Sequence, residues 1–492
     1  MPELWGSTME KRKKPQETVK DARDILSDDI LKYTFMIVPF KFQGAVDDGK
    51  IVGSDYFEKV DHKKLKYDRL YKHVAACIYE DNPDRSVYDY WVDREKCYPE
   101  VFRKVLDFDA TTEGGQNFQA QGYLKDAFVY LFGDGIGFIV FNFVFDNATD
   151  VNCFCEIMNK LKKLKRDSSL FKVRRGEETV DIFGMAVDIS QKLGLNLDLF
   201  FQHSSKDYVS AIMLNSFTHD EPQRQEDLLT QLARLKRSQG ASYGTCDEAQ
   251  GYLRPFENMY WAFSTQGVAN VNCLDPKVGN DKFLKGFYDN VTREYLFMTL
   301  IVLNQEYTLL DYCQKFVSKS YEAPSVEELN RLYNFKIHNT YTTVSHLEHY
   351  RTFYSKFMEE MGVERILEEV DAKQESIRLT YKNRAEEEQR KLDEQQREKE
   401  EERAKRSKHL NDLIKVLSAM LSVFGIAELV SNIAYFLEVG TKWSLPVASI
   451  IFIVIGSVIG ICILAVGIVM LISIIREKRA LLREKKNKRK DK

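Results

Sequence analysis

The stretch VASIIFIVIGSVIGICILAVGIVMLISII, residues 447–475, has no charged side chain at any of its 29 positions. An apolar run of about 18 or more residues is typical of a helix that crosses a membrane. A second run of spanning length, VLSAMLSVFGIAELVSNIAYFL, occupies residues 416–437. Because little chain separates the two runs, we predict a transmembrane hairpin with spans at 413–438 and 447–475 and an outer loop at 439–446.

The distribution of basic residues predicts the orientation of this hairpin. The tail at 476–492 holds ten Lys and Arg against three acids, whereas the outer loop holds only Lys442. Cytoplasmic segments next to membrane spans carry an excess of Lys and Arg. We therefore expect a multi-pass protein of the inner (plasma) membrane, in contact with lipid, with both termini in the cytoplasm.

Five polar side chains, one of them an acid, interrupt the apolar run of the first span at 416–437. They are Ser418, Ser422, Glu428, Ser431 and Asn432. Such groups are costly against lipid and usually face protein or water. We predict that these five residues line a pore, with lipid contacting the second span, where Gly456 and Gly460 suit close helix packing.

Ahead of the spans, the chain predicts a long helix. Residues 325–412 contain no proline, and Gly362 is the one glycine, so we expect a break there and a continuous helix from Val363. Between Arg384 and Lys408, 18 of 25 residues are charged, nine of each sign. Pairs of opposite charge four residues apart stabilise an exposed helix by about 0.2–0.5 kcal/mol each. A solvated single helix and a helix packed in an oligomeric bundle both fit this stalk.

Residues 31–324 predict a cytosolic α/β (α+β) domain, and residues 1–30 a polar tail without a secretory signal. Strands are expected at YTFMIVPFKF from Tyr33, at HVAACIYE from His73, and on both sides of Asp134-Gly135 within residues 127–145. The Asp-Gly pair tolerates the positive φ angles of a tight hairpin turn. Helices are expected at CFCEIMNKLKKLK and ETVDIFGMAVDISQKL.

Catalytic and metal-binding motifs are not evident in the sequence. The eight cysteines are scattered without a C-x-x-C pair, which favours reduced, non-ligating thiols. His346 and His349 have acceptable metal spacing but no evident third ligand. We therefore expect neither an enzyme nor a metal site.

Two groups of residues suit a phosphate and a base. Arg174 and Arg175 could bind phosphate bidentately, although a basic turn paired with neighbouring glutamates is the simpler interpretation. Trp261 and Gln266 offer an aromatic face and an amide, as an adenine pocket needs, although core packing is again simpler. We take these four residues as candidate ligand-binding residues for a small nucleotide, and expect no direct binding of nucleic acid.

The order of a cytosolic α/β domain, a long helix entering the first span, a short outer loop, a second span and a basic tail resembles the CorA family of divalent-cation channels and transporters. The resemblance covers residues 280–492 well and the N-terminal domain in outline. It implies a homopentamer whose stalk and first span line the pore. The family's Gly-Met-Asn tripeptide is missing, because the corresponding stretch reads YFLEVGTKWSLP, residues 435–446.

A CorA-like chain of this size without the tripeptide is similar to the CorA-type effectors of type III CRISPR antiviral defence. That resemblance implies a channel opened by a nucleotide second messenger, the conjugate of S-adenosylmethionine with AMP. A magnesium-type transporter, for which a divalent cation would be the ligand, is the first alternative. A membrane-tethered scaffold with a coiled stalk is the second.

Overall fold

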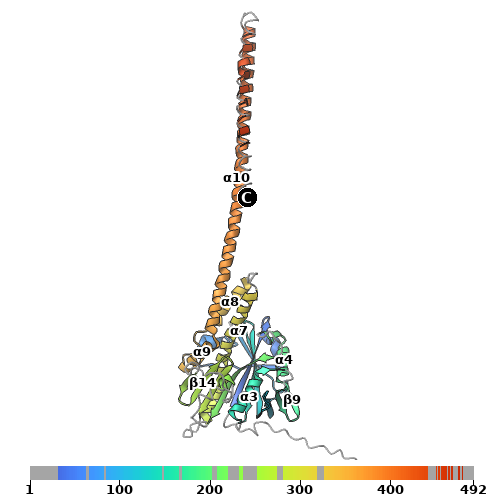
Figure 1. The fold of residues 1–492 in the computed structure, drawn as a ribbon, viewed down its shortest axis with the longest axis vertical. Coiled ribbons are helices and arrows are strands. Elements are labelled where there is room, and N and C mark those ends of the chain that lie inside the picture. Colours follow the sequence, from blue (N-terminus) through green and yellow to red (C-terminus); the bar gives the residue numbers. More distant parts are fainter. Residues whose placement is uncertain are drawn as a thin grey trace, which may run out of the picture. The chain divides into compact units, whose positions relative to one another are not determined.

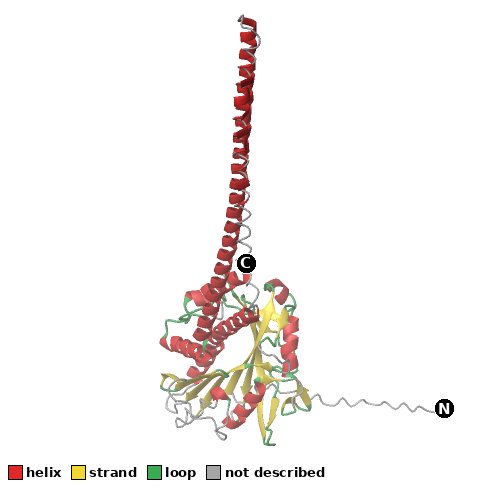
Figure 2. Cartoon of the chain, turned by 45° about the horizontal axis from the view of Figure 1, so that its top comes forward, coloured by secondary structure: helices red, strands yellow, loops and turns green. Residues whose placement is uncertain are grey.

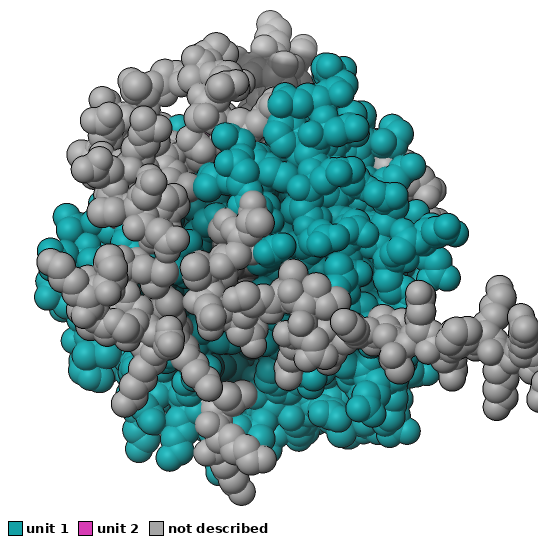
Figure 3. All heavy atoms as spheres, turned by 90° about the horizontal axis from the view of Figure 1, so that it is seen from below, with its two compact units in different colours: residues 1–378 teal, residues 379–492 magenta. Residues whose placement is uncertain are grey.

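The strand β1 (Lys32–Gln43) lies in the middle of a 13-stranded mixed sheet (Figure 1). The computed structural model describes residues 32–62, 66–82, 85–146, 149–165, 169–201, 208–219, 232–235, 252–273, 281–318 and 326–440, with short stretches between 450 and 479. Two compact units divide the chain, Met1–Arg378 and Leu379–Lys492. The first unit is the predicted mixed α/β domain, and its described atoms are teal in Figure 3.

Ten strands follow one another across this sheet. Their order is β13 (Tyr252–Phe256), β14 (Met259–Ser264), β15 (Gly267–Cys273), β12 (Ile212–His219), β1, β6 (Ile136–Phe145), β5 (Asn117–Phe132), β4 (Leu106–Thr111), β8 (Phe171–Arg175) and β9 (Glu178–Val180). Three further strands pair beside this path: β10 (Asn196–Asp198) with β1, β3 (Val87–Val92) with β5, and β2 (Phe57–Lys59) with β3. Among the described strands, β12 and β15 form the one parallel pair, and the other paired strands run antiparallel. A separate two-stranded sheet joins β7 (Lys163–Leu164) to β11 (Val209–Ser210).

Helices cover both faces of the large sheet (Figure 2). The described helices are α1 (Asp48–Val52), α2 (Lys72–Ala76), α3 (Val151–Leu161), α4 (Ile182–Lys192), α6 (Asp281–Asn290), the π-helical η2 (Val291–Tyr295), α7 (Leu296–Ser318), α8 (Val326–His338), α9 (Glu348–Met361) and α10 (Val363–Gly440). Successive side chains of a strand point to opposite faces. Accordingly, Phe35 and Ile37 of β1 join the core beneath α7 and α9, and Met36 and Val38 join the core beneath α3 and α4.

The apolar hairpin predicted within residues 127–145 is confirmed. β5 ends at Phe132, β6 begins at Ile136, and Gly135 has φ of +98°. Every residue of β6 is buried, which explains why its sequence is apolar throughout rather than alternating.

The strand expected from His73 is wrong, because residues 72–76 form the short helix α2. Val74, Ala75 and Ile78 are buried at spacings of one and four residues, which fit a helix as well as a strand. A contact with a distant segment favours the helix over the strand: the Tyr71 N–H, just before α2, donates to the Val344 carbonyl at 2.8 Å. The expected helices at 153–165 and 178–193 are present in shortened form, as α3 and α4.

The long helix is confirmed as the continuous α10, Val363–Gly440. Gly362 has φ of +65°, a left-handed conformation that ends α9 and favours glycine. Among the described residues, α10 is the one helix that is both long enough and apolar enough to cross a membrane. The N-terminal tail, most of the outer loop, much of the second span and nearly all of the basic tail lie outside the described residues, so the two-helix hairpin remains a prediction.

The β5–β6 turn carries an acid whose pKa makes stability depend on pH. Burial raises the pKa of Asp134 to about 6, although Asn304 Nδ2 donates to its carboxylate at 2.8 Å. A raised carboxyl pKa means that stability is fully present below the unfolded pKa near 4 and is lost as pH rises through 6. We expect Asp134→Asn to be more stable than the parent by roughly 1–2 kcal/mol at pH 7 and equal to it at pH 4, with the full shift discounted because the turn is partly open to solvent.

Denaturant unfolding of both chains at pH 4, 5, 6 and 7 measures this difference. A difference that stays constant across the series would show that Asp134 keeps an ordinary pKa in the folded protein.

Candidate functional site

A groove lies along one edge of β1, where two different strands pair with successive parts of that edge. Residues Tyr33–Ile37 pair with β12, whereas Lys41–Gln43 pair with β10. Between these two registers no described strand pairs with this side of β1. Clefts lined by apolar side chains and a few polar groups are common ligand sites.

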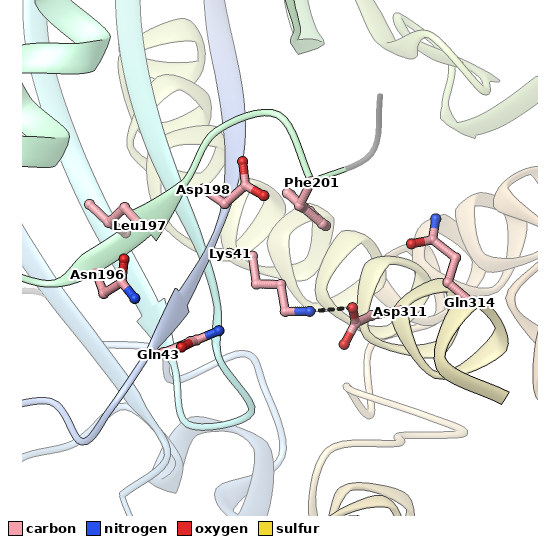
Figure 4. A pocket seen from close by; sticks show the side chains of 8 residues that line it. All are labelled: Lys41, Gln43, Asn196, Leu197, Asp198, Phe201, Asp311 and Gln314. Carbon is pink, nitrogen blue, oxygen red and sulfur yellow. Dashed lines mark hydrogen bonds and ion pairs between the residues drawn. The ribbon is translucent and has the colours of Figure 1, made fainter. Parts of the chain in front are cut away.

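Two adjoining hollows of about 200 and 300 Å³ make up this groove, and we refer to them together as the α7 groove. Phe201, Asp311 and Gln314 line both hollows. The first is also lined by Lys41, Gln43, Asn196, Leu197 and Asp198 (Figure 4). The second is also lined by Ser210, Ile212, Thr265, Glu306, Tyr307, Leu310 and Met361. Ligand pockets usually measure about 300–1,000 Å³, so the groove could take one small ligand.

Helix α7 supplies one wall because its residues repeat at helical spacing. Glu306, Leu310 and Gln314 are four residues apart, so their side chains share one face of the helix. Tyr307 lies beside them and meets the ring of Phe201 edge-on, with centroids 6.0 Å apart. This end of the groove is therefore aromatic and aliphatic, with the hydroxyls of Ser210 and Thr265 at its margin.

An ion pair crosses the first hollow. Lys41 of β1 reaches across to Asp311 of α7 (Figure 4), and Lys315 also contacts Asp311, at 2.8 Å. The amides of Gln43, Asn196 and Gln314 surround this pair. The hollow thus offers hydrogen-bond donors and acceptors, including the carboxylates of Asp198 and of Asp311, which two lysines share.

Glu306 differs from the other acids of the groove. Its Oε2 atom is buried and has no hydrogen-bond partner among the described residues. Burial raises the pKa of Glu306 to about 8, so the carboxyl is mostly protonated at neutral pH in the empty groove. Perturbed carboxyl groups in clefts are candidates for functional residues.

Met361 connects the groove to the start of α10. It is the last residue of α9 and lines the second hollow, and α10 begins two residues later, after the left-handed Gly362. A ligand in the groove therefore lies against the residue that precedes the turn into the long helix.

Trp261 is not part of the groove. Its side chain is fully buried under α9, with its ring 4.6 Å from Tyr295 and 4.8 Å from Phe353. Gln266 lies in the β14–β15 turn, where its Oε1 accepts from Lys162 Nζ at 2.6 Å. The adenine pocket predicted at these two residues is therefore corrected to core and turn packing, while adjacent Thr265 does line the groove.

The two arginines lie near the far end of the sheet. Arg174 Nε donates to Asp109 Oδ2 at 2.7 Å, and Arg175 pairs with Glu178 and donates to the Glu100 carbonyl at 2.7 Å. Six strands lie between β8 and β14, so seven strand spacings of about 4.8 Å place the arginines roughly 33 Å from Trp261 across the sheet. The predicted four-residue ligand site is therefore not brought together, and Arg175 has its expected glutamate partner.

No known protein family, curated protein or solved structure matches this chain.

We expect the double variant Arg174→Ala/Arg175→Ala to leave ligand binding unchanged and to lower stability by less than about 1 kcal/mol, because exposed ion pairs contribute little. Binding of the radiolabelled S-adenosylmethionine–AMP conjugate to both chains measures the first effect, and thermal unfolding the second. Loss of binding in the double variant alone would return the arginines to the ligand site.

The residues predicted to line a pore all lie on α10. At about 100° per residue, Ser418, Ser422, Glu428 and Asn432 fall within one arc of about 120° on the helix, whereas Ser431 lies outside it. Ser422 Oγ donates to the Ser418 carbonyl at 2.8 Å, so its hydroxyl is satisfied within the helix and could also face lipid. Among these residues of α10, Glu428 and Asn432 are therefore the ones that argue for a face turned away from lipid.

No group of three metal-binding side chains is found among the described residues. The groove residues Lys41, Glu306 and Asp311 were missed in the sequence, although one signal was available. Glu306 is a lone acid within LFMTLIVLNQEYTLL, a run otherwise typical of a buried helix. A charge kept inside such a run points to a cavity or a polar partner.

Proposed function

We propose that this protein is an oligomeric, CorA-like membrane channel whose cytosolic domain binds a nucleotide second messenger in the α7 groove and thereby opens the pore. The observation that carries this proposal is the position of Met361, which lines the groove and lies two residues before the helix that contains the apolar span. A ligand shifts a closed–open equilibrium only if it binds the two states differently. A groove wall that leads directly into α10 provides a route for that difference.

The groove chemistry supports a nucleotide. An adenine needs an apolar or aromatic surface and amide or hydroxyl groups for its edge. Phe201 and Tyr307 provide the first, and Gln43, Asn196 and Gln314 provide the second. Lys41 is the cation among the described residues that line the groove. It would bind a phosphate if the phosphate replaced Asp311 as its partner. Among nucleotides, the resemblance to CRISPR effectors selects the S-adenosylmethionine–AMP conjugate.

The exposed surface of the span supports both membrane insertion and assembly. Leu421 and Phe424 of α10 are 69% and 72% exposed, far more apolar surface than a water-facing helix normally presents. Glu428 lies between such residues, and a carboxylate at that depth costs about 2.5–3.5 kcal/mol against lipid. A ring of copies around a water-filled pore would cover the apolar surface and hydrate the acids.

Flux through liposomes tests the proposal. Protein purified in detergent is first checked for fivefold particles and then reconstituted with a fluorescent cation indicator. We expect flux to increase at least tenfold on addition of the conjugate and to stay at background without it. A monomeric particle without flux would support the scaffold, whereas rescue of a magnesium-transport-deficient host without the conjugate would support the transporter.

A further inference from the structure

The helix α10 changes character along its length. At its start, Val363 and Val370 are buried in the core beneath α7 and α9. Every residue from 378 to 415 is exposed, and the apolar span follows. We call residues 384–408 the charged segment, because 18 of these 25 residues are charged, nine of each sign.

The charged segment lacks the surface that helices use to pack together. A coiled coil repeats apolar residues at two of every seven positions, which over this length requires about seven of them. The charged segment has three, Ala385, Leu392 and Ala404. One and two heptads after Leu392 the sequence has Lys399 and Arg406, so no apolar seam runs along the helix. Copies of this segment therefore have no apolar stripe along which to join.

Charge pairs within the helix stabilise the segment instead. Five carboxylates lie four residues before a Lys or Arg, which is the favourable order: Glu386–Arg390, Glu387–Lys391, Asp393–Arg397, Glu401–Lys405 and Glu402–Arg406. Lys391 Nζ lies 2.9 Å from Glu387 Oε1, and this hydrogen bond lowers the pKa of Glu387. Each pair of this kind shifts the helix–coil equilibrium about 1.4- to 2.3-fold. Because α10 continues on both sides, the segment needs no helical nucleus of its own.

We propose that the charged segment is a free-standing helical strut that packs against no copy of itself, and that cations enter the pore from the side, through the water between neighbouring struts. This inference rests on the proposed function and adds the path of the ion to it. It departs from the resemblance to CorA, which implies a stalk that lines the pore. With nine charges of each sign, the segment has no net charge and does not select ions by sign, which leaves that selection to the span.

Hydrogen exchange of the full chain in detergent, followed by mass spectrometry, tests the strut without any need for flux. A helix held by exposed charge pairs opens locally far more often than a buried helix does. We expect the charged segment to exchange at least tenfold faster than the largely buried α7. Raising NaCl from 0.1 to 1 M shortens the screening length from about 10 to 3 Å. Relative to α7, the charged segment should then exchange about threefold faster or more.

Glu387→Gln and Glu398→Gln are a matched pair of variants, since each removes one exposed carboxylate from the charged segment. Lys391 follows Glu387 at the favourable spacing. Glu398, in contrast, has an acid four residues away on each side, Glu394 and Glu402. In a free-standing helix the first change removes an attraction and should speed exchange at 0.1 M NaCl by about 1.4- to 2.3-fold. The second removes repulsion and should slow exchange by a similar factor, and both effects should be smaller at 1 M NaCl.

Flux through liposomes tests the path of the ion. Gln396 lies in the middle of the charged segment, and a bulky polyethylene glycol maleimide attached to Gln396→Cys in every copy would obstruct a conduit bounded by packed stalks. The gaps between separate struts would stay open. We therefore expect conjugate-activated flux to stay within about twofold of that of the parent treated with the same reagent, which controls for the native cysteines.

Protection of the charged segment equal to that of α7 would overturn the strut, and so would effects of the same sign from the two glutamate substitutions. Loss of flux in the labelled Gln396→Cys chain alone would overturn entry from the side. A chain that passes no ions but shows the expected exchange would refute the channel and leave the free-standing helix standing, so the two proposals can fail separately.

Discussion

Trp261→Ala is expected to remove about 3–5 kcal/mol from the stability of the unit Met1–Arg378, the range typical of deleting a buried aromatic side chain. Trp261 is 0% exposed and packs against Tyr295 and Phe353, each less than 5 Å away between ring centroids. Alanine would leave a cavity that the sheet on one side and α9 on the other cannot close. The melting temperature of the full chain, followed by circular dichroism, should fall by roughly 5–10 °C.

Trp261→Phe is the control for this prediction. Phenylalanine keeps an aromatic ring in the same contacts and removes the indole Nε1, which has no hydrogen-bond partner among the described residues. The cost should therefore stay below about 1.5 kcal/mol, and ligand binding should match the parent. A stable Trp261→Ala chain that no longer binds the conjugate would instead place this side chain at the ligand.

Glu428→Lys is expected to lower cation flux at least tenfold in ligand-activated liposomes. In the proposed channel, Glu428 of each copy faces the pore and attracts cations, and lysine would replace each attraction by repulsion. Two like unit charges about 4 Å apart repel by about 1 kcal/mol even in water, and several copies act together around one pore. Glu428→Gln, which removes the charge without reversing it, should have a smaller effect in the same direction.

Ser431→Gln provides the comparison on the same helix. Ser431 lies outside the arc that contains Glu428 and Asn432, so a polar change there should leave the cation preference unchanged. Size-exclusion chromatography establishes that each variant still assembles. Equal flux through the parent and Glu428→Lys would remove Glu428 from the pore, and a large effect of Ser431→Gln would show that the helix is rotated from the proposed orientation.

Local patterns determined much of this structure. The apolar segments on both sides of Asp134-Gly135 required a buried hairpin, because the turn pair and the apolar runs act over neighbouring residues. Val363–Gly440 is helical for similarly local reasons: Gly362 permits the left-handed turn before it, and charge pairs and apolar runs follow at helical spacing. The length and apolar composition that would allow this helix to cross a membrane are likewise visible in the sequence.

Only the tertiary structure decided which residues share a site. Trp261 and the arginines have suitable chemistry, but six strands between β8 and β14 keep them apart. Strand order depends on pairing between distant segments, which local sequence patterns do not reveal. Lys41, Asp198 and Glu306 are far apart in the chain and meet in one groove because β1 exchanges β12 for β10 beside α7. The same packing buries Glu306 without a partner and raises its pKa, since burial depends on neighbours from distant segments.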